Sequence, residues 1–141
     1  MSISTVIPQC VRQSRTAVCL TLVVFLSGCQ PPSIDVSTTV HDGTITAYLE
    51  QRWGLFWWLS TPKTPCVDRL ELVELLPAGA QKIRWQAWTA DTVQCLDLSK
   101  FTVGVPPKGF HEKVRLTPMP PKTRVKLIVR GIGDGEVRFF L

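Results

Sequence analysis

The stretch from residue 34 to residue 51 reads IDVSTTVHDGTITAYLEQ, and it decides the fold class. Two runs rich in β-branched residues, Ile34–Val40 and Thr44–Gln51, flank the dipeptide Asp42-Gly43. Asp-Gly between two such runs is a strong signal for a two-residue hairpin turn, because both central positions of that turn need a positive φ. We therefore predict that the folded part of the chain begins with an antiparallel hairpin.

The rest of the chain also favours β-structure. Within the segment 82–90 apolar residues alternate with polar ones, so Ile83, Trp85 and Ala87 should share one face. The glycine-rich stretch Gly131–Gly135 should form the turn of the last hairpin. Further strands are expected at residues 53–60, 69–75, 82–90, 101–105, 110–116, 123–130 and 136–141. Short strands separated by prolines, with almost no helical periodicity, predict an all-β fold. We favour an antiparallel β-sandwich of immunoglobulin-like arrangement, with a small β-barrel as the alternative.

The amino-terminal segment has the pattern of a secretory leader. Arg12 and Arg15 precede an almost wholly apolar run at residues 16–26, and the small residues Ser27 and Gly28 follow. A membrane-spanning helix needs about 20 apolar residues, and this run is shorter. A cleaved signal peptide is therefore preferred to a permanent transmembrane helix.

The tetrapeptide Leu26-Ser27-Gly28-Cys29 resembles the lipobox of bacterial lipoproteins. The resemblance implies cleavage before Cys29, a diacylglycerol on the Cys29 sulfur and acylation of the new amino terminus. Gln30 stands where aspartate would favour retention in the inner membrane, so the periplasmic face of the outer membrane is favoured and the inner membrane is the alternative. The chain then divides into a signal peptide (1–28), a lipidated cysteine with a short proline-rich tether (29–33) and a β-domain (34–141).

The cysteines are consistent with export. Cys10 and Cys19 leave with the leader and Cys29 takes the lipid, so Cys66 and Cys95 remain as a pair. An oxidising compartment predicts a disulfide between them. The loop it closes has about 30 residues, worth roughly 3–4 kcal/mol in the chain-entropy model. A metal or redox pair is less favoured, because no C-x-x-C spacing occurs.

Catalytic motifs are not apparent. His41 and His111 stand in different predicted elements, and neither a G-x-S-x-G motif nor a metal-ligand spacing occurs. Removing the leader leaves 14 basic and 11 acidic side chains, a net charge of +3. This charge is too small to argue for nucleic acid, but it suits an anionic membrane surface or an acidic protein. We expect no enzymatic activity, no cofactor and no metal.

Two features could carry binding. The run at residues 53–59 includes Trp53, Trp57 and Trp58, which form either a core strand or an exposed aromatic interface. On the predicted strand 123–130, basic Arg124, Lys126 and Arg130 share one side, and aliphatic residues occupy the other. Such a stripe is either solvated outward charge or a docking surface.

These features together predict a membrane-anchored lipoprotein with a non-enzymatic role in protein interaction or envelope maintenance. Its partner would be another envelope protein. An inhibitor or a binder of small ligands is the first alternative, and a cell-envelope hydrolase is the second.

Overall fold

The structure is a computed structural model that describes residues 32–52, 61–90 and 95–141. The predicted strand at residues 53–60 lies outside this part of the chain. No helix in the described ranges is long and apolar enough to cross a bilayer. The strands are β1 (Ile34–His41), β2 (Thr44–Gln51), β3 (Cys66–Leu75), β4 (Gln81–Thr89), β5 (Leu96–Asp97), β6 (Lys100–Thr102), β7 (Phe110–Val114), β8 (Arg124–Gly131) and β9 (Gly133–Phe140), with a 3₁₀ turn η2 (Pro77–Gly79) between β3 and β4.

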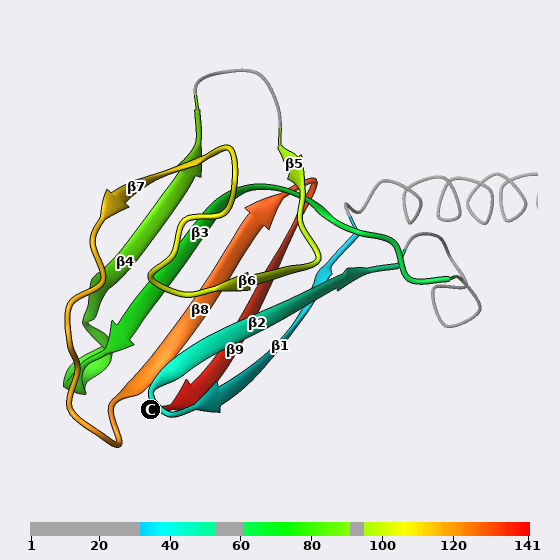
Figure 1. Ribbon diagram of the computed structural model, residues 1–141. Helices are drawn as coiled ribbons and strands as arrows, with labels where there is room; N and C mark the ends of the chain where they lie inside the picture. The colour runs from blue at the N-terminus through cyan, green and yellow to red at the C-terminus, as the bar shows by residue number, and fades with distance from the viewer. Residues whose placement is uncertain (1–31, 53–60, 91–94) are drawn as a thin grey trace, which may run out of the picture. The chain divides into compact units, whose positions relative to one another are not determined.

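The strands form two antiparallel sheets that pack face to face (Figure 1). The smaller sheet has the order β1-β2-β6, and the larger has the order β7-β4-β3-β8-β9, with β5 paired to one end of β3. The described strands therefore form a β-sandwich, as predicted, and do not close into a barrel. Part of this order, β1-β2-β6 opposite β3-β8-β9, resembles the A-B-E and C-F-G strands of immunoglobulin-like sandwiches, but β7 follows β6 in the chain and yet pairs with β4 in the larger sheet, which that arrangement does not have.

The first hairpin is confirmed. β1 and β2 pair in register from Ile34 opposite Gln51 to His41 opposite Thr44. Asp42 and Gly43 have φ values of 48° and 74°, which are the positive values that a tight hairpin turn requires. Asp-Gly supplies them at low cost because glycine has no Cβ and aspartate tolerates this region better than most residues.

The core lies between the two sheets. Trp85 is fully buried at its centre and stacks on Phe101 of the smaller sheet, with ring centroids 6.1 Å apart. Most of the alternate strand residues that point inward are aliphatic, as the period of two predicts. Those with no exposed surface are Ala47, Val67, Leu70, Leu72, Ala87, Val125, Leu127 and Val129.

The prediction that Ile83 shares a face with Trp85 and Ala87 is wrong. Trp85 pairs with Leu72 but Ile83 pairs with Val73, so Arg84 is an extra residue in β4 and forms a bulge. The bulge turns Ile83 outward, where it is 45% exposed. The Arg84 guanidinium donates from Nε to Glu74 Oε2 at 2.7 Å. The extra residue of the bulge therefore forms a partly buried ion pair with the neighbouring strand β3.

The last turn is also tighter than predicted. β8 ends at Gly131 and β9 begins at Gly133, so the connection is Ile132 alone. Asp134 and Gly135, expected in the turn, belong to β9 and pair with the end of β8. Gly133 has a φ of 104°, which only glycine adopts readily, and this permits so abrupt a reversal.

Glycine also lets the two sheets approach at one edge. A Cβ on Gly135 would clash with the Ile34 carbonyl oxygen and lie 2.7 Å from a methyl group of Val36. A Cβ on Gly133 would meet the Pro32 carbonyl oxygen. The start of β1 can therefore cross β9 only because these positions carry no side chain.

We expect Gly135→Ala to lower the free energy of unfolding by about 1–3 kcal/mol, the usual cost of overpacking. Urea unfolding of the oxidised protein measures it. Gly79→Asn is the matched control, because space around Gly79 is open and asparagine tolerates its positive φ. Equal unfolding midpoints for Gly135→Ala and the parent would contradict this account of the edge.

Candidate functional site

β8 presents the basic stripe on the outer face of the larger sheet. Arg124, Lys126 and Arg130 point away from the core, while Val125, Leu127 and Val129 between them are fully buried. Neighbouring strands add charge to the same face, since Arg69 pairs opposite Arg130 and Arg138 pairs opposite Lys126. We call this surface the basic face and define it by Arg69, Lys113, Arg124, Lys126, Arg130 and Arg138.

The carboxylate of Glu136 partly neutralises the basic face. Lys126 Nζ lies 3.4 Å from Glu136 Oε2, and Arg138 Nη2 donates to Glu136 Oε1 at 3.0 Å. Partial desolvation raises the pKa of Glu136, but the attraction of Lys126 and hydrogen bonds from Arg138 and Lys126 outweigh it. The pKa therefore lies below its ordinary value, and the ion pair persists at neutral pH.

The three predicted basic residues are not equivalent. The Lys126 side chain is only 12% exposed and is ion-paired with Glu136, so it stabilises the fold more than it offers charge to a partner. Arg124 and Arg130 are exposed at the two ends of β8. These arginines are the members of the stripe best placed to contact another molecule.

An aromatic ring extends the basic face onto β4. Arg69 Cζ lies 4.3 Å from the centroid of a Trp88 ring, and Lys113 Nζ lies 5.7 Å from it. Such cation–π contacts are worth about 0.5–1 kcal/mol each when exposed, and they hold the charged groups in place. Sequence reasoning missed Trp88, because its proximity to Arg69 depends on the pairing of β3 with β4.

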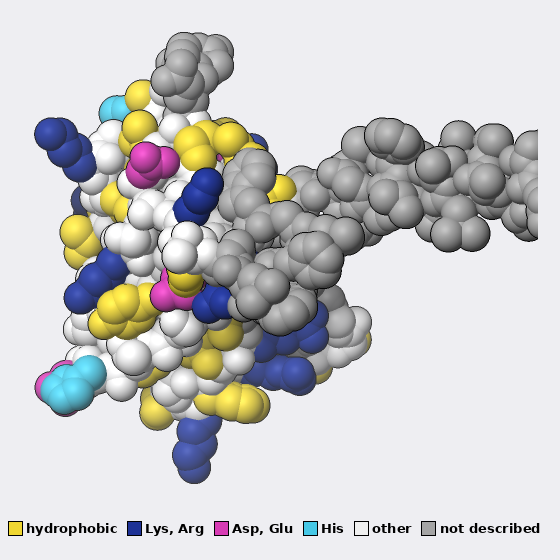
Figure 2. Space-filling model, turned by 90° about the vertical axis from the view of Figure 1, so that its right-hand side faces the viewer, with side chains coloured by type: hydrophobic (Ala, Val, Ile, Leu, Met, Phe, Trp, Pro, Cys, Tyr) yellow, Lys and Arg dark blue, Asp and Glu magenta, His cyan; other side chains and the backbone are white. Residues whose placement is uncertain are grey.

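The basic face is shallow. A depression of about 240 Å³ is lined by Lys126, Ile128, Arg130, Asp134, Gly135 and Glu136. A second depression, of about 390 Å³, lies over β1 and β2 and includes Tyr48, Glu50 and again Glu136. Figure 2 shows one side of the molecule, on which dark-blue basic side chains lie among yellow apolar ones. These open, charged hollows suit a protruding side chain of a partner better than an enclosed small molecule.

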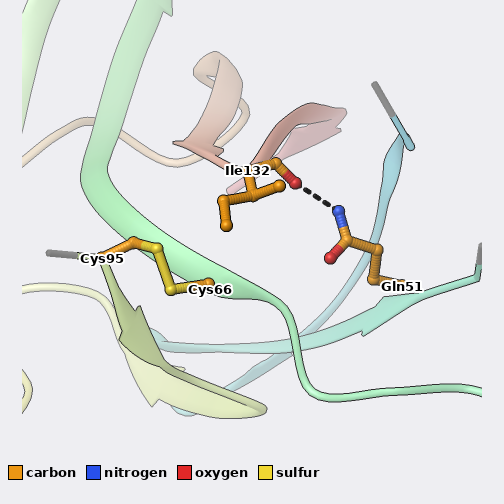
Figure 3. The surroundings of a disulfide bond; sticks show 4 residues. All are labelled: Gln51, Cys66, Cys95 and Ile132. Atoms are coloured by element: carbon orange, nitrogen blue, oxygen red, sulfur yellow. Dashed lines mark hydrogen bonds between the residues drawn. A yellow bond between two sulfur atoms is a disulfide. The ribbon is translucent and has the colours of Figure 1, made fainter. Parts of the chain in front are cut away.

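At one end of the sandwich, a buried amide joins distant segments (Figure 3). Gln51 is 1% exposed, and its Nε2 donates to the Pro32 carbonyl oxygen at 3.2 Å and to the Ile132 carbonyl oxygen. Its backbone exchanges two hydrogen bonds with Lys63, of 2.9 and 2.8 Å. Pro32, Gln51, Lys63 and Ile132 therefore meet at this end of the sandwich.

The disulfide predicted between Cys66 and Cys95 is confirmed, with a Cα–Cα distance of 5.0 Å. It joins the first residue of β3 to the residue before β5, and these two strands pair directly. The disulfide therefore secures the margin of the larger sheet at the end of the sandwich where Gln51 lies (Figure 3). The Cys66 carbonyl oxygen also accepts a hydrogen bond from the Ile132 backbone at 3.0 Å.

The histidines do not converge. His41 lies at the exposed hairpin turn of the smaller sheet, with Nδ1 2.9 Å from Asp42, and His111 lies on β7 of the larger sheet. Among the described residues, no three His, Cys, Asp or Glu side chains are grouped so that they could hold a metal ion. Cys29 and the predicted aromatic interface of Trp53, Trp57 and Trp58 lie outside the described residues.

Comparison with known proteins identifies no relative. No family model matches the chain, and no curated protein or solved structure matches it significantly. The function has to be inferred from the chain's own residues.

We expect the double substitution Cys66→Ser and Cys95→Ser to lower the free energy of unfolding by about 3–4 kcal/mol, the chain-entropy value for this loop length. Denaturant unfolding measures the loss. A reductant should destabilise the parent by a similar amount and leave the double variant unchanged. A double variant as stable as the oxidised parent would show that the disulfide has no structural role.

Proposed function

We propose that this chain is a bacterial lipoprotein whose β-sandwich is held on the periplasmic face of the outer membrane by a lipid on Cys29. The lipobox-like tetrapeptide at the end of a leader-like apolar run supports this proposal. The disulfide between Cys66 and Cys95 also supports it, because stable disulfides are typical of exported proteins. Two or more acyl chains would make the anchorage stable.

The role we propose is non-enzymatic: the basic face docks an acidic surface of another envelope protein. The observation that carries this proposal is the placement of exposed Arg124 and Arg130 on one face, with half-buried Ile128 between them. Arginine forms bidentate hydrogen bonds with carboxylates and is enriched at the energetic centres of protein interfaces. The adjacent depression could receive a protruding side chain of the partner.

Replacing Cys29 with serine tests the anchor. The parent protein should fractionate with membranes, and Cys29→Ser should appear unprocessed or in the soluble fraction, because the acceptor sulfur is missing. Cell fractionation with immunodetection is the measurement. Cys66→Ser is the matched control, since it removes a cysteine without removing the proposed acceptor, and it should remain with membranes. An unaltered distribution of Cys29→Ser would refute lipidation at this residue.

Charge reversal tests the docking surface. Crosslinking in intact cells first identifies the envelope protein that the parent captures. Arg124→Glu combined with Arg130→Glu should reduce capture of that protein at least about tenfold, since breaking a hydrogen-bonded charge pair that is buried in an interface costs about 2–5 kcal/mol.

Lys108→Glu is the matched control for this experiment, because Lys108 is exposed in the connection between β6 and β7, outside the basic face. It should leave capture intact. Raising the salt concentration should weaken capture of the parent more than that of the double variant. Equal capture by parent, control and double variant at low salt would exclude the basic face as the docking surface.

A further inference from the structure

The chain between the proposed lipid and the folded domain is short. Pro32 is the first residue that the structure describes, and it lies three positions after Cys29. Three fully extended residues span at most about 10 Å. If Cys29 carries lipid, Pro32 must therefore lie at or just outside the headgroup layer.

Pro32 is itself held by the sandwich. Its carbonyl oxygen accepts a hydrogen bond from Gln51, whose amide also donates to the Ile132 carbonyl oxygen. The same carbonyl oxygen lies where a Cβ on Gly133 would be, so it packs directly on the β8–β9 turn. The tether therefore ends at a fixed point on the domain. We call the surface around this point, formed by Pro32, Gln51, Lys63 and Ile132, the anchor-side end.

The surface around this point suits a bilayer. Ile132 is 47% exposed at the tip of the β8–β9 turn, and Lys63 is exposed beside the backbone bonds to Gln51. An exposed aliphatic side chain can enter the headgroup layer while a basic side chain at the same end pairs with lipid phosphate. The composition of the anchor-side end therefore favours contact with anionic lipid.

The opposite end of the sandwich lies far from this point. β1 runs from Ile34 beside Pro32 to His41 at the hairpin turn. At about 3.3 Å per residue, Val40 lies roughly 25 Å along the chain from Pro32. One headgroup layer is only about 5–7 Å thick, so both ends cannot lie within it while the strands stand upright.

We infer that the sandwich stands on the bilayer by its anchor-side end, with Ile132 in contact with the headgroups and the β1–β2 turn pointing into the periplasm. The inference rests on the proposed lipidation of Cys29. It goes further than anchorage, because the same short tether would also allow the domain to lie on either sheet. Two features select the upright orientation. The hydrogen bonds of Gln51 fix Pro32 at this end, and the exposed side chains there, Ile132 and Lys63, suit the headgroup layer.

Site-directed fluorescence quenching tests the orientation. Ile132→Cys and Val40→Cys are a matched pair, since both replace β-branched residues that are 47% and 44% exposed. The lipidated protein is purified from membranes, labelled with a fluorophore and placed in vesicles of phosphatidylethanolamine and phosphatidylglycerol that carry a headgroup spin label. Lys63→Cys gives a second reading on the anchor-side end.

Quenching should be roughly threefold or more stronger at positions 132 and 63 than at position 40, because the headgroup layer is thin compared with the strand. Flotation of the same vesicles reports anchorage separately. If the protein floats but quenching at position 40 equals or exceeds that at positions 132 and 63, the proposed orientation is wrong and the proposed lipid anchor is unaffected. Protein with an intact Cys29 that fails to float would overturn the anchor, and the orientation with it.

Discussion

The buried amide of Gln51 is the contact on which one end of the molecule depends. Its Nε2 bonds two carbonyl oxygens, from Pro32 and Ile132, that are about a hundred residues apart in the chain. A buried polar group left without a partner costs about 1–3 kcal/mol. The Gln51 amide and the two carbonyl groups therefore all favour the arrangement in which Pro32 and Ile132 lie beside Gln51. The start of β1 is thereby attached to the last turn, where Gly133 has no side chain to prevent it.

Local patterns in the sequence were sufficient for much of the fold. The Asp42-Gly43 turn and the alternation along β8 depend on neighbours within a few residues, so turn chemistry and the period of two predict them. The pairing of Cys66 with Cys95 followed from counting cysteines in a chain predicted to be exported, without knowledge of the fold. These features share one property, which is that no distant strand has to be placed before they can be predicted.

The predictions that failed required the register of distant strands. Ile83 turns outward because the pairing of β3 with β4 accommodates Arg84 as an extra residue beside Glu74. The last turn contains only Ile132 because β8 and β9 pair as far as the flanking glycines. Gln51 occupies an inward position of β2, and alternation alone could have marked it as a buried polar residue. Its partners could not have been identified without the packing of β1 against β9.

The candidate site shows the same division between local and distant information. Alternation places Arg124, Lys126 and Arg130 on one face, but it cannot distinguish them. The pairing with β9 does so, because it brings Glu136 to Lys126 and leaves the two arginines exposed at the ends of β8.

The two arginines also differ in their distance from the proposed anchor. Arg130 directly precedes Gly131 at the anchor-side end, whereas Arg124 lies about 20 Å further along the strand. In an upright domain, anionic headgroups would compete with a protein partner for Arg130 and leave Arg124 to the partner alone. Specific capture should therefore depend more on Arg124, and the salt sensitivity of membrane contact should depend more on Arg130.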